Sequence, residues 1–134
     1  MSYYSDMEMD VSRHIEYWRE SSREDLVVAT ELLQKRRSRH ALFFAEVALE
    51  KMIKALVVQR TSGVPPKSHD LLRLADLAGI DLPEERRLFL ARFQEYNLEG
   101  RYPERLPHPP SVVEAESLID ECRETIEWLT TLFG

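Results

Sequence analysis

ALFFAEVALEKMIKALVV, residues 41–58, contains neither glycine nor proline and is apolar over a wide arc of a helix. Its apolar residues recur at steps of three and four, which predicts an α-helix. One line runs through Ala41, Ala45, Ala48, Met52 and Leu56, and Leu42, Leu49 and Ile53 widen it. Such breadth predicts the central helix of a bundle, covered on more than one side. Part of the arc, with Phe43 and Phe44, leaves room for burial against a second subunit.

The only polar stripe on this helix consists of Glu46, Glu50 and Lys54, each four residues apart. The order of Glu50 before Lys54 favours an ion pair, worth about 0.2–0.5 kcal/mol on an exposed surface. Three interpretations remain open: an exposed rim, a polar strip in a dimer interface, and a group that handles protons. Because no nucleophile or metal partner lies nearby in the sequence, we favour the first two.

A long first helix is expected before the central one, beginning at about Asp10, with residues 1–9 as a loose lead-in. Its apolar face contains Ile15, Trp18, Leu26, Ala29 and Leu33. We expect it to end in QKRRSRH, residues 34–40, where cations suit the negative end of the helix dipole. Ser38 is the expected cap of the central helix. The basic run is either a solvated helix end or a contact for phosphate.

Three further helices are predicted after the turn TSGVPPK, residues 61–67. Ser68 or Asp70 opens a short helix that Gly79 ends. Asp81, Pro83 and Glu84 begin a fourth helix, whose apolar face contains Phe89, Phe93 and Tyr96. Ser111 caps a fifth helix with an apolar stripe of Ala115, Leu118, Cys122, Ile126, Leu129 and Phe133. No strand-like alternation appears, so we expect an all-α bundle of about five helices in a single domain over residues 1–134.

Composition excludes several classes of protein. With 134 residues, a net charge of −6 and one cysteine, Cys122, the chain has no intramolecular disulfide or cysteine zinc site, and contact with nucleic acid must be local. The acidic N-terminus is no signal peptide and no apolar run could span a membrane, so we expect a soluble cytoplasmic protein. The four histidines lack metal-ligand spacing, and glycine-rich phosphate loops are absent. We therefore expect no metal and no cofactor.

GRYPERLPHPP, residues 100–110, interrupts the helical pattern with Pro103, Pro107 and Pro109. Between the prolines lie residue types suited to phosphate binding and proton transfer: Arg101, Tyr102, Arg105 and His108. The segment is either a catalytic loop or a stiff connector between two helices. A second candidate is KSHD, residues 67–70, which is either a ligand-binding corner at a helix N-terminus or plain capping.

Four segments together resemble the HEPN domain, and more narrowly the small stand-alone HEPN proteins of bacteria and archaea. They are the first helix with Trp18, Ser22, Asp25 and Ala29, followed by ALEKMIKAL (48–56), KSHDLLRL (67–74) and GRYPE (100–104). The resemblance covers residues 12 to 132. It implies an up-and-down helical bundle that dimerises. It also implies a partner, a minimal nucleotidyltransferase (MNT), encoded in the same two-gene module of toxin–antitoxin type.

The resemblance also suggests roles for particular residues. Nucleotide or RNA phosphate would bind at Arg101, Tyr102, Arg105, Lys67 and His69. Active relatives are metal-independent RNases in which an arginine holds phosphate and a histidine, separated from it by four to six residues, acts as base. Arg101 and His108, with six residues between them, match that spacing. In some pairs the nucleotidyltransferase attaches AMP to a tyrosine near this motif, a role that falls on Tyr102.

Pro103 and Pro107 weigh against the RNase interpretation, because they prevent Arg101 and His108 from sharing a helical face. Tyr102 also stands where active relatives usually have a polar residue. The main hypothesis is therefore a dimeric partner of a nucleotidyltransferase that binds nucleotide or RNA phosphate. A metal-independent RNase toxin is the first alternative, and a structural interaction module without a ligand is the second.

Overall fold

The computed structural model describes residues 10–99, 101–106 and 108–134, so the predicted lead-in, residues 1–9, lies outside the described residues. Five α-helices and no strands occur in the described part of the chain, which confirms the all-α prediction. The helices are α2 (Val11–Gln34), α3 (Ser38–Thr61), α4 (Leu71–Leu77), α5 (Glu84–Phe93) and α6 (Val112–Thr130). Short 3-10 turns follow at η1 (Gln94–Tyr96), η2 (Pro103–Arg105) and η3 (Thr131–Phe133).

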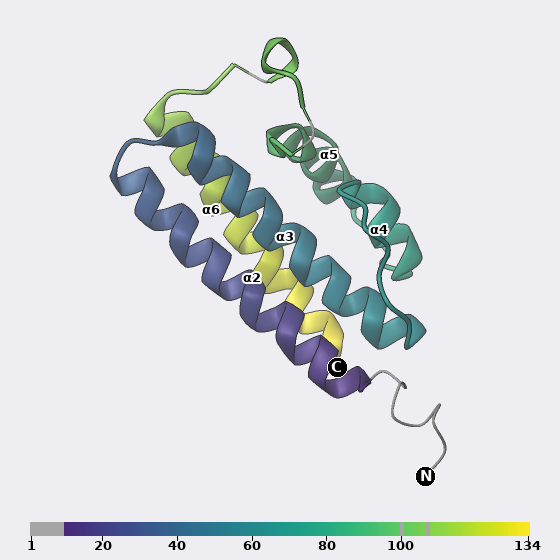
Figure 1. The fold of residues 1–134 in the computed structure, drawn as a ribbon. Coiled ribbons are helices and arrows are strands. Elements are labelled where there is room, and N and C mark those ends of the chain that lie inside the picture. The colour runs from purple at the N-terminus through teal and green to yellow at the C-terminus, as the bar shows by residue number, and fades with distance from the viewer. Residues whose placement is uncertain (1–9, 100, 107) are drawn as a thin grey trace.

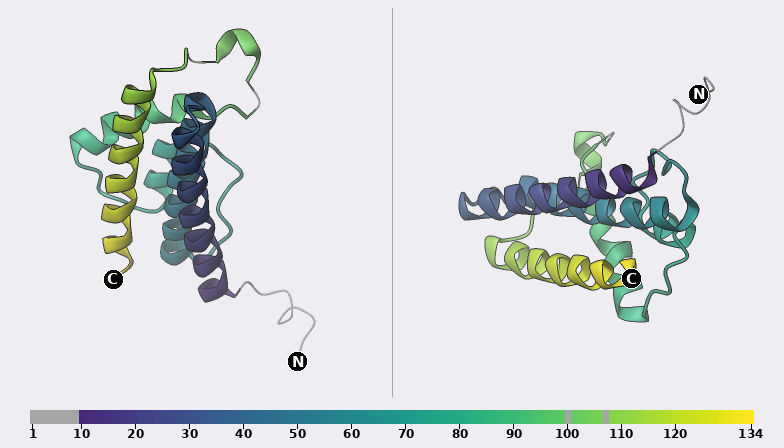
Figure 2. Two further views of the ribbon diagram at one scale, coloured as in Figure 1. Left: turned by 90° about the vertical axis from the view of Figure 1, so that its left-hand side faces the viewer. Right: turned by 90° about the horizontal axis from the view of Figure 1, so that it is seen from below.

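Helices α2, α3 and α6 lie side by side and form the body of the bundle, while α4 and η1 contact another side of α3 and α5 lies beside α4 (Figure 1). Both the start of α2 and the C-terminus lie at one end of this bundle in every view (Figures 1 and 2). At the opposite end, the segment between α5 and α6 crosses near the turn from α2 to α3. We call the described residues of this segment, 97–99, 101–106 and 108–111, the connector.

Helix α3 is the core of the bundle, as its sequence predicts. Its apolar residues from Ala41 to Val58 are almost all fully buried, apart from the partly exposed Phe43, Phe44 and Val47. Two small residues on neighbouring helices approach the backbone of α3 closely. On one side, the Ser22 hydroxyl donates to the Ala48 carbonyl at 2.6 Å. On the other side the Cys122 thiol donates to the Ala45 carbonyl at 3.3 Å. Burial of each Leu, Ile or Met here contributes roughly 1.5–3 kcal/mol.

The turn from α2 to α3 differs from the prediction. Helix α2 ends at Gln34, the first residue of the basic stretch; its last turn contains no basic residue, and Lys35 takes the C-cap position. The chain instead reverses through Arg36, whose φ of 61° is left-handed. Ser38 is the first residue of α3 and not its cap; the cap position is Arg37, which makes no side-chain capping hydrogen bond. The basic run therefore occupies a turn and the start of a helix.

The other helix boundaries follow local signals in the sequence. Asp10, Asp70 and Ser111 each accept a hydrogen bond from a backbone N–H of the first turn, at 3.2 Å in all three cases. Gly79 ends the α4 region with a φ of 66°. The aromatic face after Pro83 is also confirmed: Phe89 and Phe93 stack at 4.8 Å between ring centroids, and Tyr96 meets Phe93 at 5.7 Å. This face holds α5 and η1 on the bundle, where the connector begins.

Candidate functional site

The polar stripe of α3 is buried, so the expectation of an exposed rim is wrong. Glu46, Glu50 and Lys54 are 0%, 4% and 7% exposed. Lys54 Nζ lies 3.0 Å from Glu50 Oε2 and 5.5 Å from the centroid of the Trp18 ring, on α2. Because buried charges are costly unless paired, the pair and the indole face explain how a lysine is accommodated here.

His69 joins this stripe to the connector. Its Nδ1 lies 2.8 Å from Glu50 Oε1, and its Nε2 lies 3.2 Å from Glu99 Oε2. The Glu50 carboxylate is buried, whereas the side chains of His69 and Glu99 are 44% and 65% exposed. With a carboxylate beside each ring nitrogen, a protonated imidazolium would donate to both. The histidine therefore fastens the first residues of the connector to the buried carboxylate of α3.

Glu46 makes a second attachment to the connector. Asn97, itself buried, donates from Nδ2 to Glu46 Oε2 at 2.8 Å. The other carboxyl oxygen, Oε1, has no hydrogen-bond partner among the described residues. Burial, helped by the neighbouring Glu50, raises the pKa of Glu46 to about 8, although Asn97, Lys54 and Arg101 each lower it. At neutral pH this side chain is therefore mostly protonated and neutral.

Two hydrogen bonds donated by backbone N–H groups hold the first described residues of the connector. The Glu99 N–H donates to Asn97 Oδ1 at 2.9 Å, and the Arg101 N–H donates to the Leu98 carbonyl at 3.4 Å. A 3-10 turn, η2, follows with Pro103 at its start, and Ser111 then caps α6. The described part of the connector is thus tied down at its first residues and stiffened by proline beyond them.

The residues predicted to bind phosphate fall into two groups. Arg101, Tyr102, Arg105 and His108 all lie exposed on the connector, Tyr102 at 70%. The positive charge of Arg101 is one of the contributions that lower the pKa of Glu46. Within the described residues, however, no hydrogen bond or ring contact joins Arg101 to His108. The structure therefore shows no pairing of the two residues that would form the RNase motif.

KSHD, residues 67–70, includes both a helix cap and a residue that contacts the buried Glu50. Asp70 caps α4, and the Ser68 hydroxyl accepts from the Asp70 N–H at 3.1 Å. Capping is therefore confirmed for Asp70, whereas Ser68 only accepts a hydrogen bond from the cap residue. His69 instead turns toward Glu50, and Lys67 is exposed.

Sequence reasoning missed Asn97, Glu99 and the contact of Trp18 with Lys54. Asn97 bonds a residue 51 positions away, and its neighbours show no periodic pattern that would indicate this partner. A usable signal was the position of Asn97 and Glu99 immediately before the GRYPE segment. Polar residues there, between an aromatic helix end and a proline-rich stretch, need partners if the chain is to pack.

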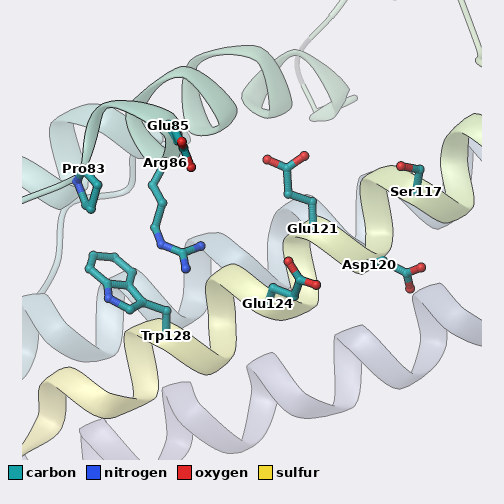
Figure 3. Close-up of a pocket in the computed structure, with 8 residues that line it drawn as sticks. All are labelled: Pro83, Glu85, Arg86, Ser117, Asp120, Glu121, Glu124 and Trp128. Carbon is teal, nitrogen blue, oxygen red and sulfur yellow. The ribbon is translucent and has the colours of Figure 1, made fainter.

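A separate hollow of about 580 Å³ lies between α5 and α6, and none of the predicted site residues lines it. Figure 3 shows four carboxylates around it, those of Glu85, Asp120, Glu121 and Glu124. Its remaining wall includes the Arg86 guanidinium, 4.8 Å from the centroid of the Trp128 ring. In the described parts of the chain, no group of three or more His, Cys, Asp or Glu side chains could hold a metal ion. Likewise, no described helix is long and apolar enough to cross a membrane.

The comparisons with known proteins agree on the fold. A family model of the HEPN domain matches residues 15–132. Among solved structures, the chain is similar to the crystal structure of TT1696 from Thermus thermophilus, with a TM-score of 0.72 and 25% sequence identity. That similarity covers 87% of this chain and 96% of the Thermus chain. No curated protein matches the sequence.

Proposed function

Because the chain belongs to the HEPN domain family over residues 15–132, we propose that it is a homodimeric HEPN protein that partners a minimal nucleotidyltransferase. In this proposal the two proteins form a two-gene module of toxin–antitoxin type in the cytoplasm. The chain binds nucleotide or RNA phosphate through the exposed side of the connector. Phe43 and Phe44, partly exposed on the otherwise buried α3, support dimerisation because apolar rings on a surface favour contact with another copy.

The observation that carries the proposal is the anchored connector. Asn97 and Glu99 tie its start to Glu46 and His69, and Arg101 and Arg105 then present their guanidinium groups to solvent. Guanidinium groups bind phosphate in a planar, bidentate fashion, and a fixed backbone lowers the entropic cost of binding. Because the net charge is −6, a polyanion needs a local basic site of this kind for a favourable approach.

Binding is tested with AMP, ATP and a short single-stranded RNA, measured by calorimetry or fluorescence anisotropy. The double variant Arg101→Ala with Arg105→Ala should weaken binding about tenfold or more, because it removes two phosphate contacts. The same loss should reduce the salt dependence of binding. Arg23→Ala, on the exposed side of α2, is the matched control and should bind as the parent protein does. Equal affinity in the double variant and the control would rule out this phosphate site.

The partner and the oligomeric state need their own tests. Light scattering on the purified protein should give the mass of a dimer. A tagged chain expressed with its neighbouring genes should retain a nucleotidyltransferase through purification. If Tyr102 accepts AMP, incubation with that enzyme and ATP should add the mass of one AMP, and Tyr102→Phe should prevent it. A monomer that retains no such enzyme contradicts the proposal.

The RNase alternative has one observation in its favour: Arg101 and His108 are both exposed, with six residues between them. A metal-independent RNase would cut single-stranded RNA in the presence of EDTA and leave cyclic phosphate ends. Arg101→Ala and His108→Ala should each abolish cleavage, whereas His40→Ala, another exposed histidine, should not. Absence of cleavage, or cleavage that survives in both variants, would exclude this activity.

A ligand-free structural module is the remaining alternative. Any ligand that binds only the folded chain must raise its melting temperature. If neither nucleotides nor RNA shift the melting temperature, while a partner protein still binds, the structural module is the better description.

A further inference from the structure

His69 contacts two carboxylates at once, and only one of them is fixed in the core. Its Nδ1 lies 2.8 Å from Oε1 of the buried Glu50, and its Nε2 lies 3.2 Å from Oε2 of Glu99. Through its other oxygen, Glu50 is paired with Lys54 at 3.0 Å. The fold therefore fixes the Glu50 side of the histidine, whereas the Glu99 side chain, 65% exposed, can turn away into solvent.

The charges of this group make the Nε2 side of the histidine suitable for an anion. Lys54 balances the charge of Glu50, so the protonated ring of His69 carries a positive charge that Glu99 balances. With Glu50 accepting from Nδ1, the second N–H of the ring, at Nε2, donates to Glu99. A phosphate offers this donor the same kind of anionic oxygen as a carboxylate does. Glu99 thus occupies a position in which an external phosphate could also be held.

We propose that Glu99 is an autoinhibitory residue, whose carboxylate occupies the Nε2–H of His69 in competition with a phosphate group of the ligand. The inference rests on the proposed function in one respect, namely that the ligand is a phosphate. A phosphate that binds His69 displaces Glu99 and releases one attachment of the connector, while Asn97 keeps the other through Glu46. No covalent bond forms or breaks, and the proton stays on Nε2. Because the coupling is reciprocal, loss of the Glu99 contact strengthens phosphate binding.

The first test measures the Kd of inorganic phosphate by NMR titration, at constant ionic strength and about pH 6, where acidic solution favours an imidazolium. Glu99→Ala should lower the Kd about two- to fivefold, since competition with an exposed ion pair reduces the apparent affinity by a factor of this order. The matched control is Glu95→Ala, which removes an exposed carboxylate of η1, four residues earlier in the chain. It should leave the Kd near that of the parent. An equal gain in both variants would overturn the inference, because general repulsion would then explain it.

The gain in Glu99→Ala must also depend on His69. In the double variant Glu99→Ala with His69→Gln, phosphate should bind no better than in His69→Gln alone. Nitrogen-15 NMR on Glu99→Ala gives a second readout, which decides the matter even if His69→Gln does not fold. Added phosphate should shift the Nε2 resonance of His69 more than the Nδ1 resonance, because Nδ1 remains with Glu50. A gain that survives in the double variant, or an Nε2 resonance that does not move, would contradict the inference.

These tests separate the inference from the proposed function, whose phosphate contacts are Arg101 and Arg105. If the double variant of these arginines loses oligoadenylate binding but Glu99→Ala leaves the Kd of phosphate unchanged, the connector site stands and the role of Glu99 is wrong. If Glu99→Ala gains phosphate binding through His69 while oligoadenylate binds to none of the proteins, the role of Glu99 stands and the connector site is wrong. If phosphate binds neither to the parent nor to Glu99→Ala, the inference is wrong.

Discussion

At the scale of single residues, the buried pair of Glu50 and Lys54 is the least replaceable part of the site. Glu50 accepts from Lys54 and also contacts His69, so its loss leaves the buried Lys54 without a carboxylate and His69 with Glu99 alone. We expect Glu50→Ala to lower the free energy of unfolding by about 3–5 kcal/mol, because it strands a buried charge. Urea denaturation measures this.

The matched control is Glu16→Ala on the exposed face of α2, which should change the free energy of unfolding by less than about 0.5 kcal/mol. Glu50→Gln keeps an oxygen for hydrogen bonding but not the charge, and should fall between the two. If Glu50→Ala is no worse than Glu16→Ala, the pair is not buried in solution.

Residues of the site were predictable from the sequence to the extent that they share a helix. Glu46, Glu50 and Lys54 are visible as one stripe because the helical period alone puts them on one face. Their burial was not visible, since it depends on Trp18 from α2 and on Asn97 from beyond α5. The partner of a polar side chain across the fold leaves no local pattern.

At the scale of elements, Gly79 offers the cleanest test of a predicted boundary. Its φ of 66° is left-handed, and a Cβ added there would meet nothing within 4 Å. Any loss of stability in Gly79→Ala must therefore come from the backbone, and we expect about 1–2 kcal/mol. Thermal or chemical denaturation gives the value.

Gly63 provides the comparison, because it lies in a turn without such a φ and an added Cβ would only touch Thr61, whose Oγ1 would lie at 3.4 Å. Gly63→Ala should be close to neutral. Similar losses at both positions would mean that the left-handed conformation is not what Gly79 supplies.

Helix boundaries were predictable wherever one side chain decides them. Asp10, Asp70 and Ser111 cap their helices, as residues with short polar side chains do. Ser38 also has a short polar side chain but does not cap α3. The left-handed Arg36 brings the chain into the helix one residue earlier, so Ser38 is already helical. The connector was recognisable from its prolines, but its attachment to α3 was not.

At the scale of the whole molecule, Glu46 makes stability depend on pH. Its pKa of about 8 in the folded chain exceeds the ordinary value of 4.5, so the folded state binds the extra proton between these values. Stability should therefore fall as pH rises through this window, by up to about 1.4 kcal/mol per pH unit from this group.

Below about pH 4.5 both states carry the proton, so this contribution is flat there. Denaturation from pH 4.5 to 8 should show the decline in the parent and a shallower one in Glu46→Gln, with Glu16→Gln as a control for the loss of one exposed carboxyl. If the slopes of the parent and Glu46→Gln coincide, Glu46 is not buried as the protonated acid.

Because the C-terminus and the start of α2 lie at one end of the bundle (Figure 2), the order of the helices along the chain can be changed by protein engineering. Gln59 and Arg60 donate to the Phe133 and Leu132 carbonyls, which fastens the C-terminal turn beside the end of α3. Since α2 starts at that same end, a short peptide could join the C-terminus to the residues before α2, and new termini could be opened in the connector (Figure 2). Such a circular permutant would keep the helices, but the connector near Arg101 would remain joined to the bundle at one end only. Purification handles on the original termini would likewise leave the connector clear for a partner.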